Sequence, residues 1–432
     1  MTLLAAVSLL SLVAMMLTRR FVPSHFVVLS IFIAGAFLIP VVLTSFYFPS
    51  ALASTAIFGQ LVGALVASVF GFFVALLVAH FASGMRPGLR VERRKHITFT
   101  EDAGQASWSV AIVLLLLSLI GVAASVRVHY LVAGVAPWQQ TAYELNVAFS
   151  QFDASVGFIG RLARIGIPVG LYAFLKGVRT TSGPRRYVLL GVAAISLLSL
   201  LSVRRSPLLH LVFYAATALM IGARTRSQHR AALATIAALL AGSLAYFGSV
   251  QVATNKALDS TVIWSSLADG AIYIAGNIAY ADCMSAREDG FEEGFSFPLQ
   301  TYAIHALAGT PMPDMSKPFC GIGSVRIEND VKDVHFNTSP LYFDLVVDFG
   351  YAAMLLIFFG IGASIVVVGS GSAVSLGLLA MVTTAATLTF RENMFGQYDF
   401  ITAIAVYFVL MLIDISPRYR RNNRRIHSTT RS

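Results

Sequence analysis

The chain has 432 residues, of which 57% are hydrophobic and only 12% charged, and its mean hydropathy is +0.75. Soluble domains carry about 45–50% apolar and about 25% charged residues, so this composition excludes a soluble enzyme, a coiled coil and a disordered chain. The formal net charge is +10 at pH 7. Basic loops of a polytopic inner-membrane protein explain that excess, and nucleic acid is not an expected partner.

Eleven apolar stretches are long enough, or nearly so, to cross about 30 Å of hydrocarbon as helices. They are continuously apolar rather than alternating, which favours helices over a barrel and predicts an all-α polytopic membrane protein. The predicted spans are Met1–Leu17, Phe26–Phe46, Ile57–Ala79, Ser107–Val126, Phe158–Leu175, Tyr187–Ser202, Pro207–Ala223, Ala231–Val250, Leu341–Val368, Ser372–Phe390 and Tyr398–Ile415. Residues 1–250 then hold eight helices, 251–340 an outer loop or lid domain, 341–415 three more helices, and 416–432 a basic tail.

The orientation follows from the distribution of cations, because Lys and Arg concentrate in cytoplasmic loops. Twenty of the 31 basic residues fall in segments that would share one side of the membrane, namely 19–20, 86–95, 176–186, 224–230 and 418–431. In the first span the arginines follow the apolar run, whereas a cleaved signal peptide carries its charges ahead of it. We therefore expect a bacterial inner-membrane protein with its N-terminus outside and its C-terminus in the cytoplasm.

The long segment from Gln251 to Pro340 lies outside in this topology and is too long for a simple connection. It holds five basic residues against eleven acidic ones, and it also holds both cysteines of the chain, Cys283 and Cys320. A disulfide is permitted in an oxidising compartment, but two buried thiols explain the sequence equally well because spacing cannot show that they meet.

Six arginines break the positive-inside pattern by lying at the outer face. Arg204 and Arg205 occupy a short outer turn, Arg161 and Arg164 lie three apart near the outer end of the fifth span, and Arg127 and Arg391 end the fourth and tenth spans. Guanidinium suits a phosphate at the bilayer surface because its planar fork makes paired hydrogen bonds. Contact with lipid headgroups explains Arg127 and Arg391 taken singly. Six cations from four places are more than anchoring needs, and we predict a pyrophosphate site.

Carboxylates cluster at the start of the ninth span. Ser339 and Pro340 are typical of a helix start, with Ser as the N-cap, and the helix dipole alone explains Asp344. Asp348 lies two turns in and would enter the hydrocarbon, so we expect the face shared by the two carboxylates to point into a cavity. His335 is a candidate base near neutral pH, and an exposed loop imidazole is an equally good interpretation.

The outer segment also combines acidic and aromatic residues in a way that suits a sugar, since rings cover its C–H faces and acids accept its hydroxyl protons. A solvated acidic loop would look the same. The sequence holds no P-loop, no HExxH and no CxxC. Glycine pairs such as Gly360-Ile361-Gly362 lack the setting of a nucleotide fingerprint and favour helix packing instead. ATP-driven transport and metal-centred hydrolysis thus have no support.

At three places the chain resembles the O-antigen polymerase (Wzy-type, oligosaccharide repeat-unit polymerase) family. The turn from Ser202 to Leu209, with Arg204 and Arg205, is similar to the family's short arginine turn. The stretch from Tyr273 to Asn277 resembles its loop entry, and the stretch from Asn337 to Gly350 resembles its exit into a helix with Asp-Phe-Gly. His335-Phe336-Asn337 is also similar to the related O-antigen ligases, although the spacing from His335 to Gly350 is longer than we expect for a ligase.

The resemblance implies a membrane glycosyltransferase of the GT-C class that uses neither nucleotide sugar nor metal nor another cofactor. Its donor would be a polymer on undecaprenyl pyrophosphate, and a lipid-linked repeat unit would supply the attacking hydroxyl. A chain-length regulator and a flippase would be its partners in the bilayer. Arg204, Arg205, Arg161 and Arg164 would stabilise the departing pyrophosphate, and Asp348, Asp344 or His335 would take the acceptor's proton. Arg127, Arg391, Tyr273 and Asn337 complete the predicted substrate-binding set.

Three other functions stay open at this point. An O-antigen ligase-type transferase would use the same donor with a different acceptor. A lipid-linked oligosaccharide flippase or exporter would favour internal repeats and short loops, against which the single long outer segment argues. A non-catalytic assembly partner would not need Asp348 within a span.

Overall fold

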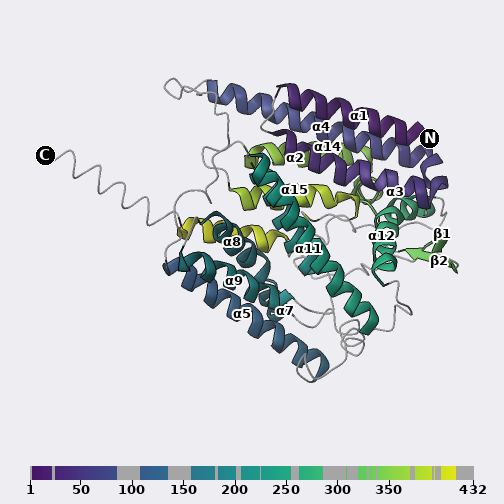
Figure 1. Cartoon of the computed structure of the whole chain (residues 1–432). Coiled ribbons are helices and arrows are strands. Elements are labelled where there is room, and N and C mark those ends of the chain that lie inside the picture. The colour runs from purple at the N-terminus through teal and green to yellow at the C-terminus, as the bar shows by residue number, and fades with distance from the viewer. Residues whose placement is uncertain are drawn as a thin grey trace. The chain divides into compact units, whose positions relative to one another are not determined.

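In its described residues the computed structural model is almost entirely helical (Figure 1), and five of the described helices are long and apolar enough to cross a membrane. This confirms the prediction of an all-α membrane protein. The structure describes residues 2–21, 25–84, 108–134, 157–180, 183–200, 206–223, 225–253, 262–285, 308, 320–327, 330–336, 339–369, 375–391, 394 and 400–414. The five long apolar helices are Leu3–Arg20, Phe26–Tyr47, Thr55–Phe81, Trp108–Val132 and Leu341–Gly369, and shorter apolar helices cover Leu208–Gly222, Leu376–Phe390 and Phe400–Asp414. The count of eleven spans and their orientation stay predictions.

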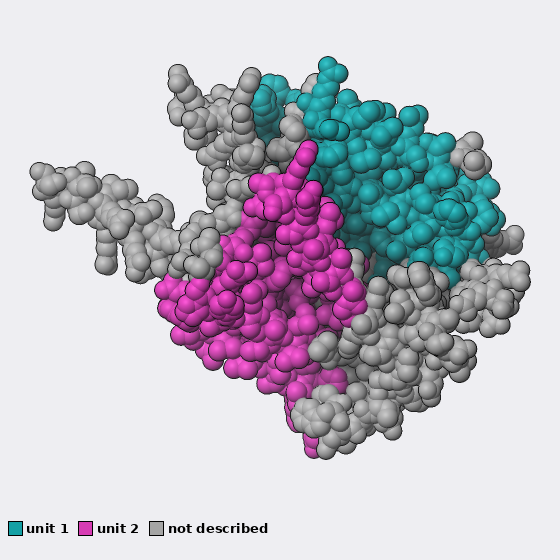
Figure 2. Space-filling model, in the orientation of Figure 1, with its two compact units in different colours: residues 1–98, 263–374, 382–400 teal, residues 99–262, 375–381, 401–432 magenta. Residues whose placement is uncertain are grey.

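The chain divides into two compact units (Figure 2). Unit 1 comprises residues 1–98, 263–374 and 382–400, and unit 2 comprises residues 99–262, 375–381 and 401–432. The boundaries expected at residues 250 and 340 stay predictions. Helix α15 (Leu376–Thr387) passes from one unit to the other.

Unit 1 is built from apolar helices followed by a small sheet. Its elements are α1 (Thr2–Phe21), α2 (Phe26–Ile33), the π-helical turn η2 (Ala34–Leu38), α3 (Ile39–Tyr47), η3 (Pro49–Ala53), α4 (Thr55–Gly84), α12 (Val262–Ser285), β1 (Cys320–Ile327), β2 (Asp330–Phe336), α14 (Leu341–Gly369) and η6 (Leu388–Phe390). The two strands pair antiparallel, with a register shift between Gly321 and Gly323. Such bulges bend a strand and strengthen its twist.

Helices α4 and α14 approach each other closely because small residues line their contact. A side chain at Gly71 would overlap the backbone carbonyl of Phe359, and one at Gly362 would overlap that of Ser68. A side chain at Gly360, by contrast, would meet no atom within 4 Å. The expected packing role of the glycine pair therefore holds for Gly362 only, and small residues at a helix interface are typical of membrane helices.

Helix α14 is not the continuous span that the sequence predicts. Its backbone leaves helical geometry at Gly350, where φ is 83° and ψ is 171°, so residues 341–349 and 351–369 form two helical segments. That combination of angles is essentially restricted to glycine because any Cβ would be strained there. Asp348 is consequently not two turns inside one long helix, as predicted, but lies near the end of the first, nine-residue segment.

Unit 2 is a bundle of helices of moderate length. They are α5 (Trp108–Ala133), α7 (Gly157–Ala163), α8 (Gly166–Arg179), α9 (Pro184–Leu200), α10 (Ser206–Gly222), α11 (Arg226–Ala253) and the terminal helix Phe400–Asp414, which joins unit 2 from residue 401. Helix α9 packs against both α5 and α8, and α10 packs against α8 and α11. A side-chain hydrogen bond between Ser118 and Ser196, with oxygens 2.7 Å apart, fixes the contact of α5 with α9.

The fifth predicted span, Phe158–Leu175, is broken in the structure. Helix α7 ends at Ala163, a turn follows at residues 164 and 165, and α8 begins at Gly166. The chain packs closely against α9 at this point, because a side chain at Gly166 would overlap Ser199. Arg161 therefore lies in α7 and Arg164 in the turn that follows it, and their shared role stays a prediction.

Candidate functional site

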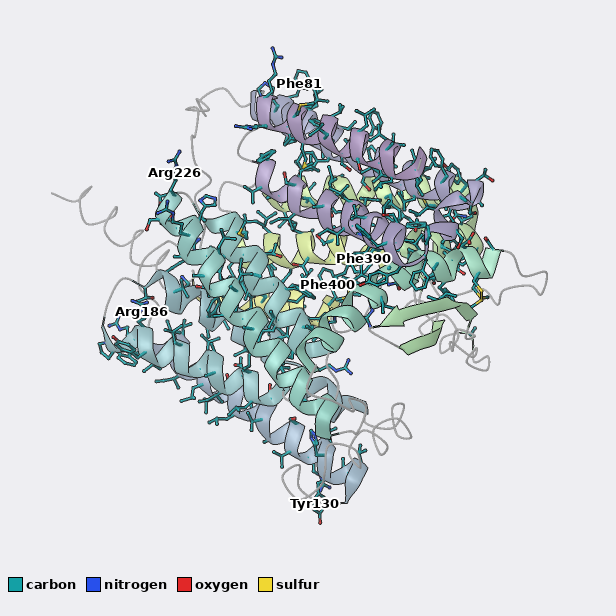
Figure 3. The ribbon with its side chains drawn as sticks, turned by 45° about the vertical axis from the view of Figure 1, so that its right-hand side comes forward. Phe81, Tyr130, Arg186, Arg226, Phe390 and Phe400 are labelled. Atoms are coloured by element: carbon teal, nitrogen blue, oxygen red, sulfur yellow. A yellow bond between two sulfur atoms is a disulfide. The ribbon has the colours of Figure 1, made fainter. Side chains whose placement is uncertain are left out.

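A disulfide between Cys283 and Cys320 joins the end of α12 to the first residue of β1, with the two Cα atoms 6.5 Å apart (Figure 3). This answers the question that the sequence left open between a disulfide and two thiols. In the sheet, Cys320 pairs with Phe336 and Gly321 with His335. The disulfide therefore holds the backbone of His335 close to the end of α12. The same helix contains Tyr273, where the stretch that resembles the polymerase family begins.

Helix α12 is held in unit 1 by an apolar cluster. Ile272, Ala275 and Ala279 pack with Phe48 and Ala51, and Ile322 of β1 packs against the same cluster. The sequence suggested a polar outer segment here, but the stretch from Ala275 to Ala281 is buried throughout. Both the disulfide and this cluster anchor the hairpin, so the position of β2 is set by α12.

Asn277 is fully buried on α12, and its side-chain nitrogen lies 3.4 Å from the carbonyl oxygen of Ile274. One turn later the carboxyl of Asp282 is half-buried and hydrogen-bonded by the side chain of Ser54. Burial raises the pKa of Asp282, and the hydrogen bond from Ser54 opposes that shift. The end of α12 next to the disulfide is therefore a partly desolvated polar surface.

Ser339 and Asp344 form a buried pair at the start of α14. The Ser339 hydroxyl donates a short hydrogen bond to the Asp344 carboxylate, and the two side chains are 0% and 3% exposed. The helix itself begins at Leu341, with the carbonyl of Pro340 accepting from the amides of Phe343 and Asp344 at 3.1 and 3.3 Å. Ser339 thus binds the carboxylate of Asp344, which makes Asp344 a positioning group.

Asp348 is half-buried, one turn after Asp344 on the same short segment, while Phe349 beside it is 56% exposed. The break at Gly350 follows directly, and the second segment begins with Tyr351, whose hydroxyl donates to the carbonyl of Gly59 at 3.1 Å. The positive end of the second segment's dipole lies at this break. Asp348 is therefore partly exposed and lies near the positive end of a helix dipole.

Arg391 ends the turn η6, which packs against α14 and η2 within unit 1. Its backbone amide bonds the carbonyl of Leu388 at 2.9 Å, and its side chain is half-buried. Asp344, Asp348 and Arg391 thus belong to elements of one unit that contact each other. Among the predicted site residues with described side chains, Asp344 and Asp348 share one short helical segment, and Arg391 belongs to the same unit.

The predicted arginines of unit 2 have different surroundings. Arg127 is exposed on α5, and its guanidinium lies 5.8 Å from the ring centre of Tyr130. An exposed arginine beside a tyrosine ring at the end of a helix is typical of residues that anchor a helix at the membrane–water interface. Arg164 is half-buried in the turn between α7 and α8, and its carbonyl accepts from the amide of Ile167 at 3.0 Å.

Several predicted residues lie outside the described residues. Arg204, Arg205 and Asn337 belong to this group. For Arg161, Tyr273 and His335 only the backbone is described, in α7, α12 and β2 respectively. Their roles stay predictions.

Sequence reasoning missed a buried ion pair in unit 2. Lys176, which was counted among loop cations, lies in α8, and its Nζ is 2.7 Å from Oδ2 of Asp414; the side chains are 2% and 4% exposed. The Tyr172 hydroxyl donates to the same carboxylate oxygen at 2.9 Å. A signal was present, because Asp414 is an acid at the end of an apolar helix beside a strongly basic tail.

The start of α14 presents a half-buried carboxylate, a group that can accept a hydrogen bond or a proton, one turn from a buried carboxylate held by Ser339. Within the described ranges, no group of three His, Cys, Asp or Glu side chains is arranged to hold a metal ion. Comparison with known protein families, with characterised proteins and with solved structures finds no match to this chain.

Proposed function

We propose that this protein is a membrane glycosyltransferase that polymerises undecaprenyl-pyrophosphate-linked oligosaccharide repeat units into a surface polysaccharide at the extracytoplasmic face of a bacterial inner membrane. The observation that carries the proposal is the broken start of α14. An ionisable side chain within an apolar segment, such as half-buried Asp348, is a candidate functional group. It lies next to the helix break, in the stretch that resembles the polymerase family.

The disulfide supports an extracytoplasmic site. Structural disulfides persist in oxidising compartments and are rare in the cytoplasm. Both cysteines precede His335 in the segment 251–340, and the carboxylates follow His335 along the chain. A site built on this segment would therefore face the compartment in which lipid-linked repeat units are joined.

In the proposed reaction, the acceptor's sugar hydroxyl attacks the anomeric carbon of the donor. The bond from that carbon to the pyrophosphate oxygen breaks, a glycosidic bond forms, and the hydroxyl proton passes to a carboxylate. Asp348 is the better base of the pair, because Asp344 is buried and already accepts from Ser339. His335 stays an alternative base.

Negative charge grows on the leaving pyrophosphate, and fixed cations would stabilise it. Arg204 and Arg205, with Arg161 and Arg164, are the proposed pyrophosphate ligands, and Arg391 is the proposed substrate cation of unit 1. Removing one such charged contact typically lowers the rate by about 10²–10³. A chain-length regulator and a flippase are the proposed partners.

The test is deletion of the gene followed by complementation, with surface polysaccharide resolved by gel and lipid-linked intermediates measured by mass spectrometry. We expect the deletion strain to carry single repeat units on the cell-surface anchor, and the wild-type gene to restore long chains. Asp348→Asn should fail to restore them, whereas Asp348→Glu should restore short chains. Arg186→Gln, at an exposed cation of α9, serves as the control.

Each alternative predicts a different result. Total loss of surface polysaccharide with periplasmic lipid-linked polymer would indicate a ligase, and accumulation inside the cell would indicate a flippase. If Asp348→Asn restored full-length polymer at normal protein level, the role given to this carboxylate would be wrong.

A further inference from the structure

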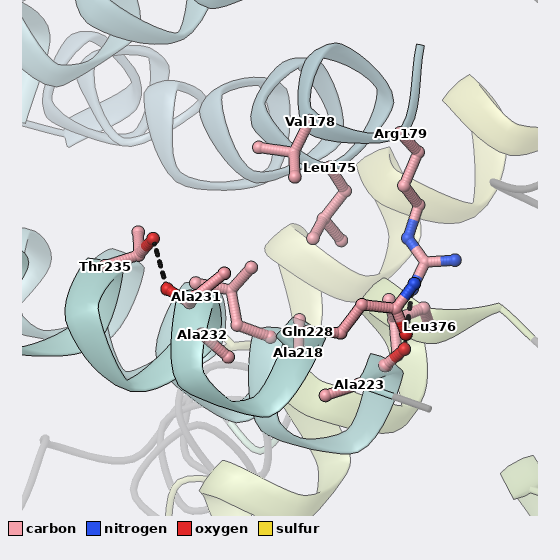
Figure 4. A pocket seen from close by; sticks show the side chains of 12 residues that line it. Leu175, Val178, Arg179, Ala218, Ala223, Gln228, Ala231, Ala232, Thr235 and Leu376 are labelled. Carbon is pink, nitrogen blue, oxygen red and sulfur yellow. Dashed lines mark hydrogen bonds between the residues drawn. The ribbon is translucent and has the colours of Figure 1, made fainter. Parts of the chain in front are cut away.

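A cavity of about 450 Å³ lies within unit 2, among α8, α10, the first turns of α11 and the start of α15 (Figure 4). This volume falls within the range of about 300–1,000 Å³ that is usual for small-molecule sites. None of the residues that line the cavity belongs to the proposed catalytic set. Its lining residues are Leu175, Val178, Arg179, Ala218, Leu219, Gly222, Ala223, Gln228, Ala231, Ala232, Thr235 and Leu376.

The lining is apolar on most sides and basic at one point. Leucine, valine and alanine side chains make the walls, Arg179 is the charged residue among those that line the cavity, and none of the lining residues is acidic. The Arg179 Nη2 lies 3.5 Å from the carbonyl oxygen of Gly222, at the end of α10, which offsets the negative end of that helix. The cavity therefore suits a ligand that is apolar over most of its surface and negatively charged at one point.

The beginning of α11 adds two positive charges to this part of unit 2, next to a capped helix start. Thr225 and Gln228 form a reciprocal capping pair, in which each backbone amide is bonded at 3.2 Å by the other's side chain. Arg226 and Arg230 on the same turns are exposed. Figure 3 shows Arg226 and Arg186 toward one end of unit 2 and Tyr130 toward the opposite end. The predicted orientation assigns the arginine end to the cytoplasmic leaflet, whose anionic lipids attract such cations.

We propose that this cavity binds an anionic phospholipid, with the phosphodiester at Arg179 and part of an acyl chain against the wall made by Leu175, Ala218 and Ala232. A soluble phosphate ester would use the guanidinium but leave the apolar wall without a partner. A zwitterionic lipid would bring an ammonium group to a lining that offers no acid. An anionic lipid satisfies both halves of the lining, because guanidinium pairs with phosphate and alanine and leucine pack against methylenes.

The experiment measures lipid binding to the purified full-length protein by native mass spectrometry and by thermal unfolding in detergent. Added probes are dioleoyl phosphatidylglycerol, dioleoyl phosphatidylcholine and inorganic phosphate. Arg179→Gln removes the cation, and Ala231→Phe fills the cavity from its exposed rim. Arg186→Gln and Ala234→Phe are matched controls, since both positions are exposed and neither lines the cavity.

We expect the wild-type protein to bind phosphatidylglycerol at least tenfold more tightly than phosphatidylcholine. Arg179→Gln and Ala231→Phe should lose that preference, whereas the two controls and Arg179→Lys should keep it. Equal binding of the two lipids, or loss of the preference in the controls as well, would overturn the proposal. Stabilisation by inorganic phosphate equal to that by phosphatidylglycerol would also overturn it, because the site would then take a soluble anion.

Discussion

The buried ion pair between Lys176 and Asp414 offers the sharpest test of the packing in unit 2. The charged atoms are 2.7 Å apart, the side chains are 2% and 4% exposed, and Tyr172 donates to the same carboxylate. Removing one member of such a pair leaves an uncompensated charge in an apolar interior and costs about 3–5 kcal/mol. A cooperative unit of about 200 residues loses about 2–4 °C for each kcal/mol, so Asp414→Asn should lower the melting temperature by roughly 6–20 °C.

Replacing both charges should be far less damaging, because two apolar side chains of similar volume need no partner. We expect Lys176→Met combined with Asp414→Leu to recover most of the stability that either single change removes. The measurement is a double-mutant cycle by thermal unfolding of the purified protein in detergent, with Arg230→Met as the exposed control. If the double variant lost the sum of the two single losses, the side chains would not interact and the reasoning would be refuted.

Two further predictions concern unit 1. Gly350→Ala should cost at least about 1–3 kcal/mol through backbone strain alone, since φ is 83° and no atom lies within 4 Å of the added Cβ. Gly360→Ala is the control, because Gly360 is equally uncrowded but has ordinary helical geometry, and it should be neutral or slightly stabilising in the same melting assay. If Gly350→Ala and Gly360→Ala changed the stability equally, α14 would be a continuous helix. Both cysteines should resist maleimide labelling until a reductant is added, and Cys283→Ser should make Cys320 react with the maleimide. The same substitution should lower the free energy of unfolding by about 4 kcal/mol, because the disulfide joins cysteines 37 residues apart in the sequence. Labelling of the wild-type protein without reductant would contradict the disulfide.

The positions of the long apolar helices were predictable from local pattern. Predicted Ile57–Ala79 and Ser107–Val126 correspond to α4 and α5, and each is longer in the structure by a few residues. A run of apolar side chains carries this information by itself, because a span must satisfy every backbone hydrogen bond within its own helix. The same runs could not show that α14 breaks, since glycine occurs both inside membrane helices and at breaks.

The candidate site was predictable in its residue types and less so in its geometry. Asp344 and Asp348 were identified from their spacing, but the hydrogen bond from Ser339 distinguishes a buried positioning group from a half-buried candidate base. Similarly, the basic character of segment 176–186 was evident, yet nothing in that segment indicated that Lys176 turns inward to Asp414. Both distinctions depend on neighbours that are decided by packing.

The sequence by itself determined that this protein is helical, that it is apolar enough for a membrane and that its basic residues concentrate in a few segments. Those properties are sums over neighbouring residues. Only the tertiary structure decided that Cys283 meets Cys320, that Lys176 meets Asp414 and that the chain breaks at residues 164 and 350. Pairings between distant segments depend on which helices pack together, and the free energy of that packing is a property of the whole fold rather than of any local stretch.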